Sequence, residues 1–578
     1  MFDGPGVSLA RPRRRVGWVK DLMSTPRPPS NEKQRPGPVG GDALAGVDAE
    51  VGVDAGVGVD AGAGAHAPGG ARSPRTEALR RQLGLVVLAW VFGSLWMWTI
   101  SGAAMTQFAR ELGLPDAGFG VLAALPFLGT LFQLPASWVQ ERFGRRKPWF
   151  ILTLGSSRLL WVAVALLPWV VPAGWGESAR WGLMLGLVGL SWVLGHLGGP
   201  AFMSWFSDLV PRRVRGRYVG LRNLVTLPLS LLATLGVGAW LAQTEAAEAA
   251  AATAGVAGEG GRLLVVTSLL IGLAGLLGLL DILMFFWVRD PRPTRGDVDS
   301  RWGQMLRTPL KDRNFRRYLI YNFTLMLALG FLGQYVWLFV LDQAKVSFLQ
   351  ANLMLIAVPL VLRSLAYPFW GRVVDRIGKK PVILISGGLF VLGPMGWLFV
   401  TPELVWPGYA LTMLSPLVFP GIEIANFNFM LDLAETRKGQ SGGSAYVAIN
   451  SIVVGLGGMA SGLLGSAVAA GIPQFHWEGT VDWPWLAWVG MEVGAGGAVV
   501  VVTYHGVLFM LSMALRVAAL VWATTLVEPR AAGTREALQY VSSSLYSNLR
   551  QGLLMPTRVV GNAARWSYRL NRRVRRPG

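Results

Sequence analysis

The 578-residue sequence contains no cysteine and only four histidines. A disulfide, a thiol nucleophile and a cysteine-ligated metal site are therefore excluded. Charged residues are also few, at 15% of the chain, whereas soluble domains carry about 25%. With 52% hydrophobic residues, the composition is not that of a soluble protein.

Common enzyme motifs are missing as well. The sequence has no G-x-x-x-x-G-K-[ST] phosphate loop, no H-E-x-x-H pair and no G-x-S-x-G nucleophile elbow. We therefore expect a protein that is not an enzyme, with no catalytic residue, no metal ligand and no cofactor.

Long uncharged apolar runs dominate the chain instead. Each is about 20 residues long, which suffices to cross a hydrocarbon core of about 30 Å as a helix. Strands of outer-membrane barrels alternate in polarity and are excluded by these continuous runs. The sequence predicts an all-α membrane protein whose twelve transmembrane helices span 84–107, 118–139, 148–171, 181–206, 218–242, 263–288, 315–341, 349–371, 381–400, 406–430, 444–470 and 505–527.

The basic residues fall on one side of the predicted membrane. Of 53 Lys and Arg, 45 lie before the first helix, after the last, or in the loops that share that side, and four lie on the opposite side. Cytoplasmic loops concentrate Lys and Arg. We therefore expect a multi-pass protein of the cytoplasmic (inner) membrane with both termini in the cytoplasm.

The helical part repeats internally. Three prolines of the second helix and its loop recur 233 residues later: Pro126, Pro135 and Pro148 match Pro359, Pro368 and Pro381. This repeat predicts two six-helix halves, 81–288 and 315–528, joined by a charged linker at 289–314. The Gly-, Pro- and Ala-rich segment 1–80 predicts a disordered cytoplasmic tail, and 529–578 a basic cytoplasmic one.

Two loops carry a specific motif. The second reads GRVVDRIGKK from Gly371, and the first, SWVQERFGRRK from Ser137, matches it except for Ser137 and Glu141. The pattern resembles the loop signature G-x-x-x-D-R-x-G-R/K-R/K of the major facilitator superfamily. The resemblance implies twelve helices in two pseudo-symmetric halves and alternating access by a rocker-switch motion.

The resemblance also implies gating by the matching residues, which are Glu141, Arg142, Gly144, Arg145, Arg146, Gly371, Asp375, Arg376, Gly378, Lys379 and Lys380. Gly371 is expected to let two helices approach closely, and Gly378 to permit a tight turn. Anchoring of the basic residues at lipid headgroups is the alternative. Asp208 and Asp432 end two further helices and are candidates for salt bridges between the halves; solvated helix ends are the other interpretation.

Polar residues inside predicted helices are candidates for the substrate site, because they are costly in a membrane. In the superfamily, helices 1, 4, 7 and 10 line the central cavity, and helix 8 flanks it. Glu423 is the main candidate, since it lies about 13 Å from the end of its helix and suits reversible protonation; a structural carboxyl at a proline-distorted turn is the alternative. His196 is either a substrate contact or a packed neutral side chain. The remaining candidates are Trp98, Asn322, Gln334, Tyr335, Arg363, Asn426 and Asn428.

The implied activity is secondary transport of a small polar solute. GRRKPWFIL after the second helix resembles a GRRRPFI stretch of proton-coupled sucrose transporters, which suggests a sugar and a proton symporter. A transporter-like sensor and a lipid flippase are alternatives from other classes. We expect a monomer that contacts a small-molecule substrate, membrane lipids and protons, and no nucleic acid.

Overall fold

The computed structural model describes residues 74–133, 135–137, 139, 145–210, 215–254, 261–290, 307, 309–402, 404–435, 444–481, 498–529, 531–533 and 535–543. These described residues include twelve helical spans that are long and apolar enough to cross a membrane. The predicted number of helices is therefore confirmed. Most of the two tails predicted as 1–80 and 529–578, most of the linker 289–314, and the motif residues Glu141, Arg142 and Gly144 lie outside the described residues.

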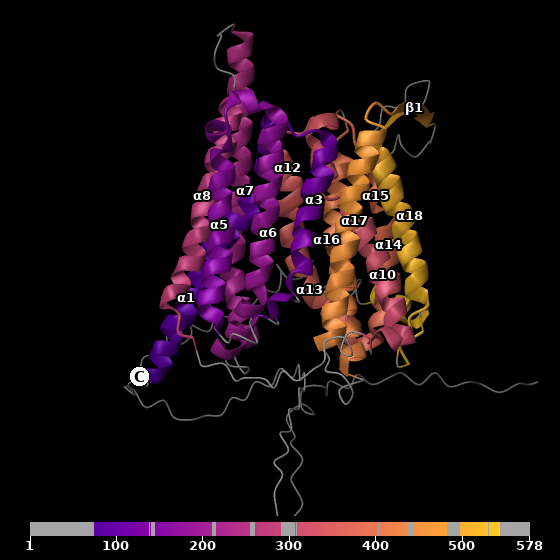
Figure 1. Cartoon of the computed structure of the whole chain (residues 1–578). Coiled ribbons are helices and arrows are strands. Elements are labelled where there is room, and N and C mark those ends of the chain that lie inside the picture. Colours follow the sequence, from indigo (N-terminus) through magenta and orange to yellow (C-terminus); the bar gives the residue numbers. More distant parts are fainter. Residues whose placement is uncertain are drawn as a thin grey trace, which may run out of the picture. The chain divides into compact units, whose positions relative to one another are not determined.

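The described residues of the first half form long helices and short segments (Figure 1). The long helices are α1 (Pro74–Ile100), α3 (Asp116–Leu131), α5 (Arg146–Val170), α6 (Gly176–Leu209), α7 (Arg215–Thr253) and α8 (Arg262–Met284). The short segments are α2 (Ala103–Glu111), η1 (Ala173–Trp175) and η3 (Phe285–Trp287). The first predicted helix, 84–107, breaks at residues 101–102, where Gly102 adopts an extended conformation before α2.

The second half is more interrupted. Its long helices are α10 (Arg313–Gly330), α13 (Val358–Ile377), α14 (Lys379–Val391), α16 (Trp406–Glu435), α17 (Ser444–Gly471) and α18 (Tyr504–Thr524). Its short segments are α11 (Tyr335–Leu338), η4 (Phe339–Gln343), α12 (Phe348–Asn352), η5 (Leu353–Ala357), α15 (Gly393–Gly396) and η6 (Trp397–Phe399). Two of these, η4 and η5, are π-helical turns, which occur often at functional sites.

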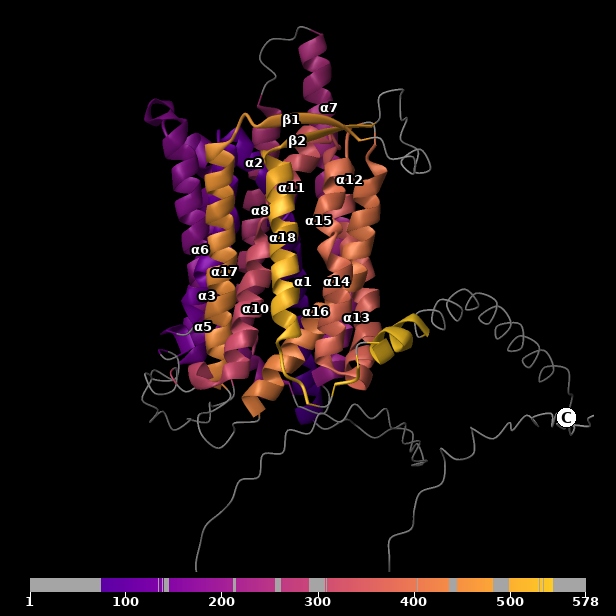
Figure 2. The same cartoon turned by 90° about the vertical axis from the view of Figure 1, so that its right-hand side faces the viewer.

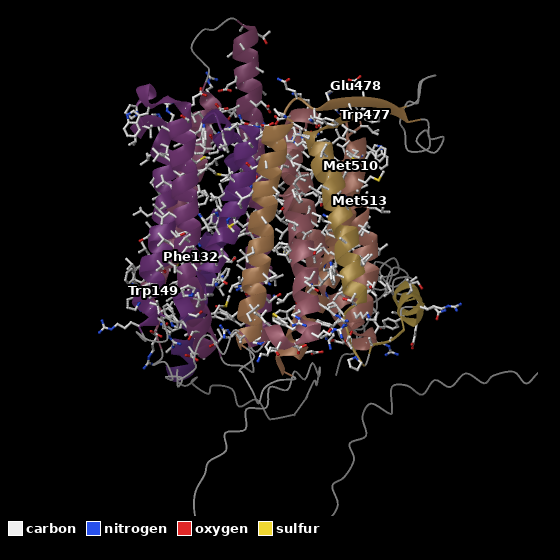
Figure 3. The ribbon with its side chains drawn as sticks, turned by 45° about the vertical axis from the view of Figure 1, so that its right-hand side comes forward. Phe132, Trp149, Trp477, Glu478, Met510 and Met513 are labelled. Carbon is white, nitrogen blue, oxygen red and sulfur yellow. The ribbon has the colours of Figure 1, made fainter. Side chains whose placement is uncertain are left out.

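The bundle has two ends, which we name by their features. The basic face is the end where α1 begins and α18 ends, and the hairpin face is the opposite end (Figures 1 and 2). An antiparallel pair of strands, β1 (His476–Val481) and β2 (Ala498–Thr503), lies over the hairpin face. Trp477 and Glu478 mark this end in Figure 3. The all-α prediction from the sequence did not include these strands.

The hydrophobic cores differ between the two ends. Toward the basic face, each half has its own core, one around Phe150 and Trp205 and the other around Tyr318 and Phe429. Toward the hairpin face, two cores combine residues of both halves, so that Phe108, for example, belongs to the same cluster as second-half residues. The halves are therefore packed together near the hairpin face and have separate cores near the basic face.

Glycines permit the closest approach between the halves, where α3 packs on α17. A Cβ added at Gly120 would lie 2.4 Å from the carbonyl oxygen of Gly462, and one added at Gly462 would lie 2.5 Å from that of Gly120. One added at Gly458 would meet the ring of Phe127 at 2.3 Å. Small residues allow helices in membranes to pack backbone to backbone, and here they join the two halves.

Candidate functional site

Polar contacts join the two halves at the hairpin face. Arg110 at the end of α2 forms an ion pair with Asp342 in η4. Tyr504, which begins α18, donates a hydrogen bond to Oδ2 of Asp116 at the start of α3, with an oxygen–oxygen distance of 2.6 Å. These contacts link first-half and second-half elements across the same end of the bundle.

Asn352 makes the most buried of these cross-half contacts. Its side chain is 1% exposed. Its Oδ1 accepts a hydrogen bond from the backbone N–H of Ala103 at 3.3 Å, and its Nδ2 donates to the carbonyl of Thr234 in α7 at 3.0 Å. One amide therefore ties the second half to two elements of the first.

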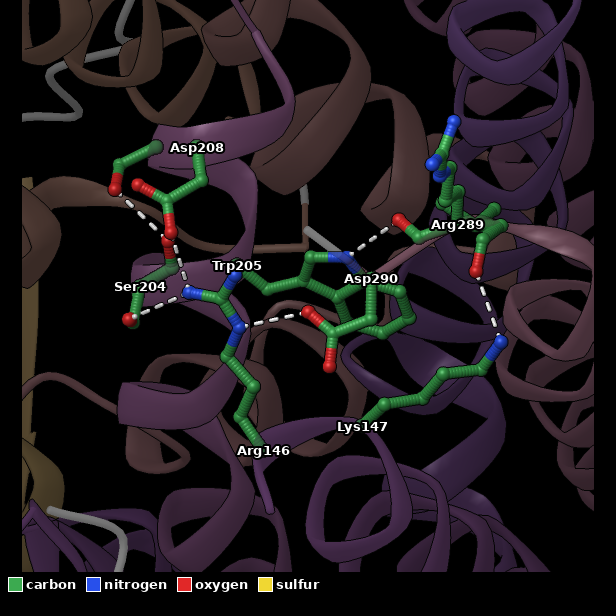
Figure 4. A network of polar contacts seen from close by, with 9 residues as sticks. Arg146, Lys147, Ser204, Trp205, Asp208, Arg289 and Asp290 are labelled. Carbon is green, nitrogen blue, oxygen red and sulfur yellow. Dashed lines mark hydrogen bonds and ion pairs between the residues drawn. The ribbon is translucent and has the colours of Figure 1, made fainter. Parts of the chain in front are cut away.

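At the basic face, the motif residue Arg146 lies in a network within the first half (Figure 4). The side chain is nearly fully buried, and its guanidinium binds Asp208 at 2.6 Å, Asp290 at 2.8 Å and the hydroxyl of Ser204 at 3.1 Å. Neighbouring Lys147 donates to backbone carbonyls after α8. The network ties the start of α5 to the ends of α6 and α8.

The second half repeats this arrangement with other residues. Lys379 pairs with Asp432 at 2.6 Å and with Glu528 at 3.6 Å. Glu528 also accepts hydrogen bonds from the backbone N–H groups of Lys379 and Lys380, and Lys380 Nζ donates to carbonyls at the end of α18. Glu528 thus caps α14, a role that the motif did not indicate.

Among the described residues, the ion pairs of Asp208 and Asp432 differ from those expected between the halves. Each aspartate pairs within its own half, because the preceding loop presents Arg146 or Lys379 to the adjacent helix end. The close helix approach expected at Gly371 is also absent, since a Cβ there would meet open space. Gly378 does end α13 with φ of 93°, a conformation that favours glycine.

The other described motif residues face outward. Arg145 and Asp375 are exposed. Arg376 is also exposed, and its guanidinium lies 5.3 Å from the ring centre of Tyr540. These positions place charge at the basic face without any cross-half ion pair among the described residues.

A cavity with a volume of about 950 Å³ lies between the first half and α13. Residues of α1, α5, α6, α7 and α8 line it from the first half. Its aromatic walls include Trp90, Trp96 and Trp98, and polar groups come from Asn223 and Ser364 among others. The volume lies in the range of about 300–1,000 Å³ typical of ligand sites.

A polar triad borders this cavity on the second-half side. Arg363 of α13 forms an ion pair with Glu423 of α16. The hydroxyl of Tyr367, which lines the cavity, donates to Oε2 of Glu423 at 2.7 Å and accepts from Nε of Arg363 at 3.0 Å. Arg363 and Glu423 are 40% and 32% exposed, so the triad is partly accessible to solvent.

Comparison with known proteins identifies the family. The profile of the Major Facilitator Superfamily matches residues 87–462. The chain belongs to the Major Facilitator Superfamily. It is therefore a multi-pass membrane transporter and not an enzyme.

The individual relatives of this superfamily member are distant. The probable nitrate/nitrite transporter NarK2 of Mycobacterium tuberculosis is 26% identical over 152 residues, which cover 21% of this chain and 38% of NarK2. The match thus spans less than half of that relative.

Two solved structures show the same fold. The nucleoside transporter NupG has a TM-score of 0.52 at 13% identity and covers 78% of this chain and 98% of NupG. A bacterial homologue of the human lysosomal transporter Spinster has a TM-score of 0.50 at 17% identity, covering 82% of this chain and 99% of that one.

In this superfamily member, two asparagines predicted for the cavity region, Asn322 and Asn426, form a network with Asn450, which the sequence did not single out. Nδ2 of Asn426 donates to Oδ1 of Asn322 at 3.2 Å, and Nδ2 of Asn322 donates to Oδ1 of Asn450 at 2.8 Å. Tyr318 donates to the backbone carbonyl of Asn426 at 2.8 Å. The network joins α10, α16 and α17. Asn428 is half-buried and lies outside it.

The other predicted site residues are divided between the cavity and the closed hairpin face. Trp98 lines the large cavity, whereas His196 borders a smaller one of about 150 Å³ and its Nδ1 lies 2.8 Å from the carbonyl oxygen of Trp192. Tyr335 is fully buried against α3 and α17, and Gln334 precedes it at the N-cap of α11. Tyr335 therefore belongs to the cross-half packing.

The buried charges Arg158 and Asp281 were not among the predicted site residues, yet both line the large cavity. The guanidinium of Arg158 lies 3.3 Å from the ring centre of Trp96 and interacts electrostatically with Asp281. A Cβ at Gly93 would lie 2.5 Å from Asp281 Oδ2, and one at Gly278 would lie 2.7 Å from Arg158 Cδ. Gly93 and Gly278 could have indicated that α8, which carries Asp281, packs closely on α1 and on α5.

Proposed function

We propose that this secondary transporter carries a small polar solute, with sugars as the first class to test, through the 950 Å³ cavity. The observation that carries the proposal is a ligand-sized cavity that lies between the halves and has both aromatic walls and polar groups. Tryptophan faces stack on apolar ring faces, while hydroxyl and amide side chains can exchange hydrogen bonds with solute hydroxyls.

The proposed orientation follows from charge. With 45 of 53 basic residues on the terminal side, the basic face lies in the cytoplasm of the cell and the hairpin face lies outside. The cross-half contacts at the hairpin face then close the outer gate, and the conformation faces inward. Thiol labelling of single cysteines placed at the two faces of intact cells tests this orientation.

The proposed coupling site is the triad. A neutral Glu423 would lose its charge attraction for Arg363, and the released guanidinium would become available to the solute. Protonation of one carboxyl would thereby change both the binding site and the contact between α13 and α16. Proton symport follows if the loaded, protonated carrier is the form that changes conformation.

Proteoliposomes test the coupling directly. In Glu423→Gln, which is neutral at every pH, uptake driven by a pH gradient should be lost while solute exchange across the membrane continues. Glu177→Gln, an exposed glutamate at the start of α6, is the matched control. Gradient-driven uptake by Glu423→Gln at the control rate would refute the coupling proposal. A thermal-stability screen with sugars, nucleosides, amino acids and organic acids would first identify the solute.

Lipid flipping is the second candidate. Leu224 lines the cavity from α7 yet is 70% exposed, so an apolar side chain that can face lipid borders the cavity. Movement of a fluorescent phospholipid between leaflets of proteoliposomes would support this function over solute transport. A sensor would bind solute but would move neither solute nor lipid across the membrane.

A further inference from the structure

Arg516 is a buried charge that the central site does not use. It lies in α18, twelve residues after the helix begins and eight before it ends. At 1.5 Å per residue it is about 18 Å from one end and about 12 Å from the other. Its side chain is 5% exposed. A guanidinium keeps its charge in proteins, and a charge at this depth is costly unless it is compensated.

The protein around Arg516 satisfies the guanidinium only in part. Nη1 donates to the carbonyl of Phe390 at 2.8 Å, and the guanidinium carbon lies 3.9 Å from the ring centre of Phe390. Nε is buried and has no hydrogen-bond partner among the described residues. No carboxylate of the described residues forms an ion pair with Arg516 or contributes to its electrostatic environment. Arg158, by contrast, has Asp281 as a charge partner.

A cavity of about 270 Å³ adjoins Arg516 within the second half. Arg363 also lines this cavity, but its charge is paired with Glu423. The cavity therefore retains one uncompensated positive charge, that of Arg516. The other lining groups include the hydroxyl residues Thr412 and Ser415 and the aromatic side chains Phe390, Trp397 and Phe419.

We propose that this cavity is a binding site for a small monocarboxylate with an apolar body. One negative charge balances Arg516, and a planar carboxylate matches the hydrogen-bonding fork of a guanidinium. The aromatic and aliphatic walls bury the apolar body, and a volume below the usual range for ligand sites limits its size. The site shares no lining residue with the 950 Å³ cavity. The proposal concerns binding and does not depend on which solute is transported.

Benzoate is a suitable probe, and benzamide is its neutral isostere. The melting temperature of the purified full-length protein is measured in detergent against increasing sodium benzoate, with benzamide, sodium nitrate and sodium phosphate in parallel at constant ionic strength. A ligand of the folded state stabilises by RT ln(1 + [L]/Kd). We expect benzoate to raise the melting temperature in a saturable way, with benzamide inert and the inorganic anions weaker.

Four variants distinguish the site from general anion effects. Arg516→Gln should raise the Kd for benzoate about tenfold or more, since it removes a charged hydrogen-bond donor, and Arg516→Lys should bind more tightly than Arg516→Gln. Ser415→Leu fills the cavity and leaves every charge in place, so it should abolish binding even if Arg516→Gln fails to fold. Arg316→Gln, an exposed arginine of α10, should bind benzoate normally.

Three outcomes overturn the proposal. The first is stabilisation by benzamide equal to that by benzoate, which would remove the role of charge. The second is undiminished benzoate binding by Ser415→Leu, which would place the ligand elsewhere. The third is nitrate or phosphate binding as tightly as benzoate, which would remove the role of the apolar body. None of these readouts involves flux, so they leave the proposed transport function to its own tests.

Discussion

Replacing Gly120 by alanine should destabilise the closed hairpin face. The new Cβ would lie 2.4 Å from the carbonyl oxygen of Gly462, 2.5 Å from the hydroxyl of Tyr335 and 2.6 Å from the backbone N of Ser466. Two of these atoms are backbone, so no rotamer change relieves the overlap. Restoring ordinary contact requires α3 and α17 to separate by about 1 Å, since carbon contacts are optimal near 3.5 Å.

The cost can be stated from known overpacking effects. Inserting a methyl group into a filled core costs about 1–3 kcal/mol. The overlap exists only where α3 of the first half contacts α17 of the second. A conformation in which the halves separate at the hairpin face is therefore not destabilised by the new methyl group. The equilibrium between the two should shift by a factor of about 5–150 toward the separated state.

Cysteine labelling measures this shift without background, since the natural chain has no cysteine. Ala104 is fully buried in a core that both halves share, and a cysteine placed there reports opening of the hairpin face. Its reaction rate with a membrane-impermeant maleimide should rise by about 5-fold or more when Gly120→Ala is added.

Gly236→Ala is the matched control, because it makes the same exchange in α7 where a Cβ meets nothing within 4 Å. Labelling that is equal in the Gly120→Ala and Gly236→Ala proteins would refute the inference that the α3–α17 approach holds this conformation. Faster labelling in both would show instead that the effect of alanine on helix stability dominates.

Three further perturbations test the polar networks. Arg146→Gln should lower the free energy of unfolding by about 1–3 kcal/mol, since it leaves two partly exposed carboxylates without their cation. Arg145→Gln, at the exposed neighbouring position, should leave the melting temperature unchanged. Equal melting temperatures of the two variants would contradict a structural role for the network. Asn352→Ala should cost the closed state about 1–3 kcal/mol because it leaves the buried N–H of Ala103, at the start of α2, without its acceptor, and faster labelling of a cysteine at position 104 would detect it. Asp342→Asn should accelerate that labelling less, because this ion pair is partly exposed and its loss should cost the closed state at most about 1 kcal/mol. The effect on the labelling rate should vanish at high salt. A salt-independent effect would contradict this assignment.

The local pattern of the sequence was sufficient to predict the membrane-spanning helices. Uncharged runs of helical length are visible residue by residue, because lipid requires each spanning segment to satisfy its own backbone hydrogen bonds. The repeated prolines and the paired loops at Arg146 and Lys379 were equally readable. They led to the twelve spans and to the superfamily, both of which are confirmed.

Partners across helices could not be read in the same way. The sequence singled out Glu423 and Arg363 separately, and only the packing of α13 on α16 made them a pair bridged by Tyr367. Asp208 was expected to face the other half, and the fold instead turned it toward Arg146.

The sequence by itself determined where the chain crosses the membrane and how its charge is divided between the two sides, since both depend on composition along the chain. Only the tertiary structure decided which end of the bundle is closed, which carboxylate lies beside which arginine, and that Arg516 has no carboxylate partner among the described residues. Those properties depend on distances between helices, and a single glycine such as Gly120 can change such a distance without altering the hydropathy of its helix.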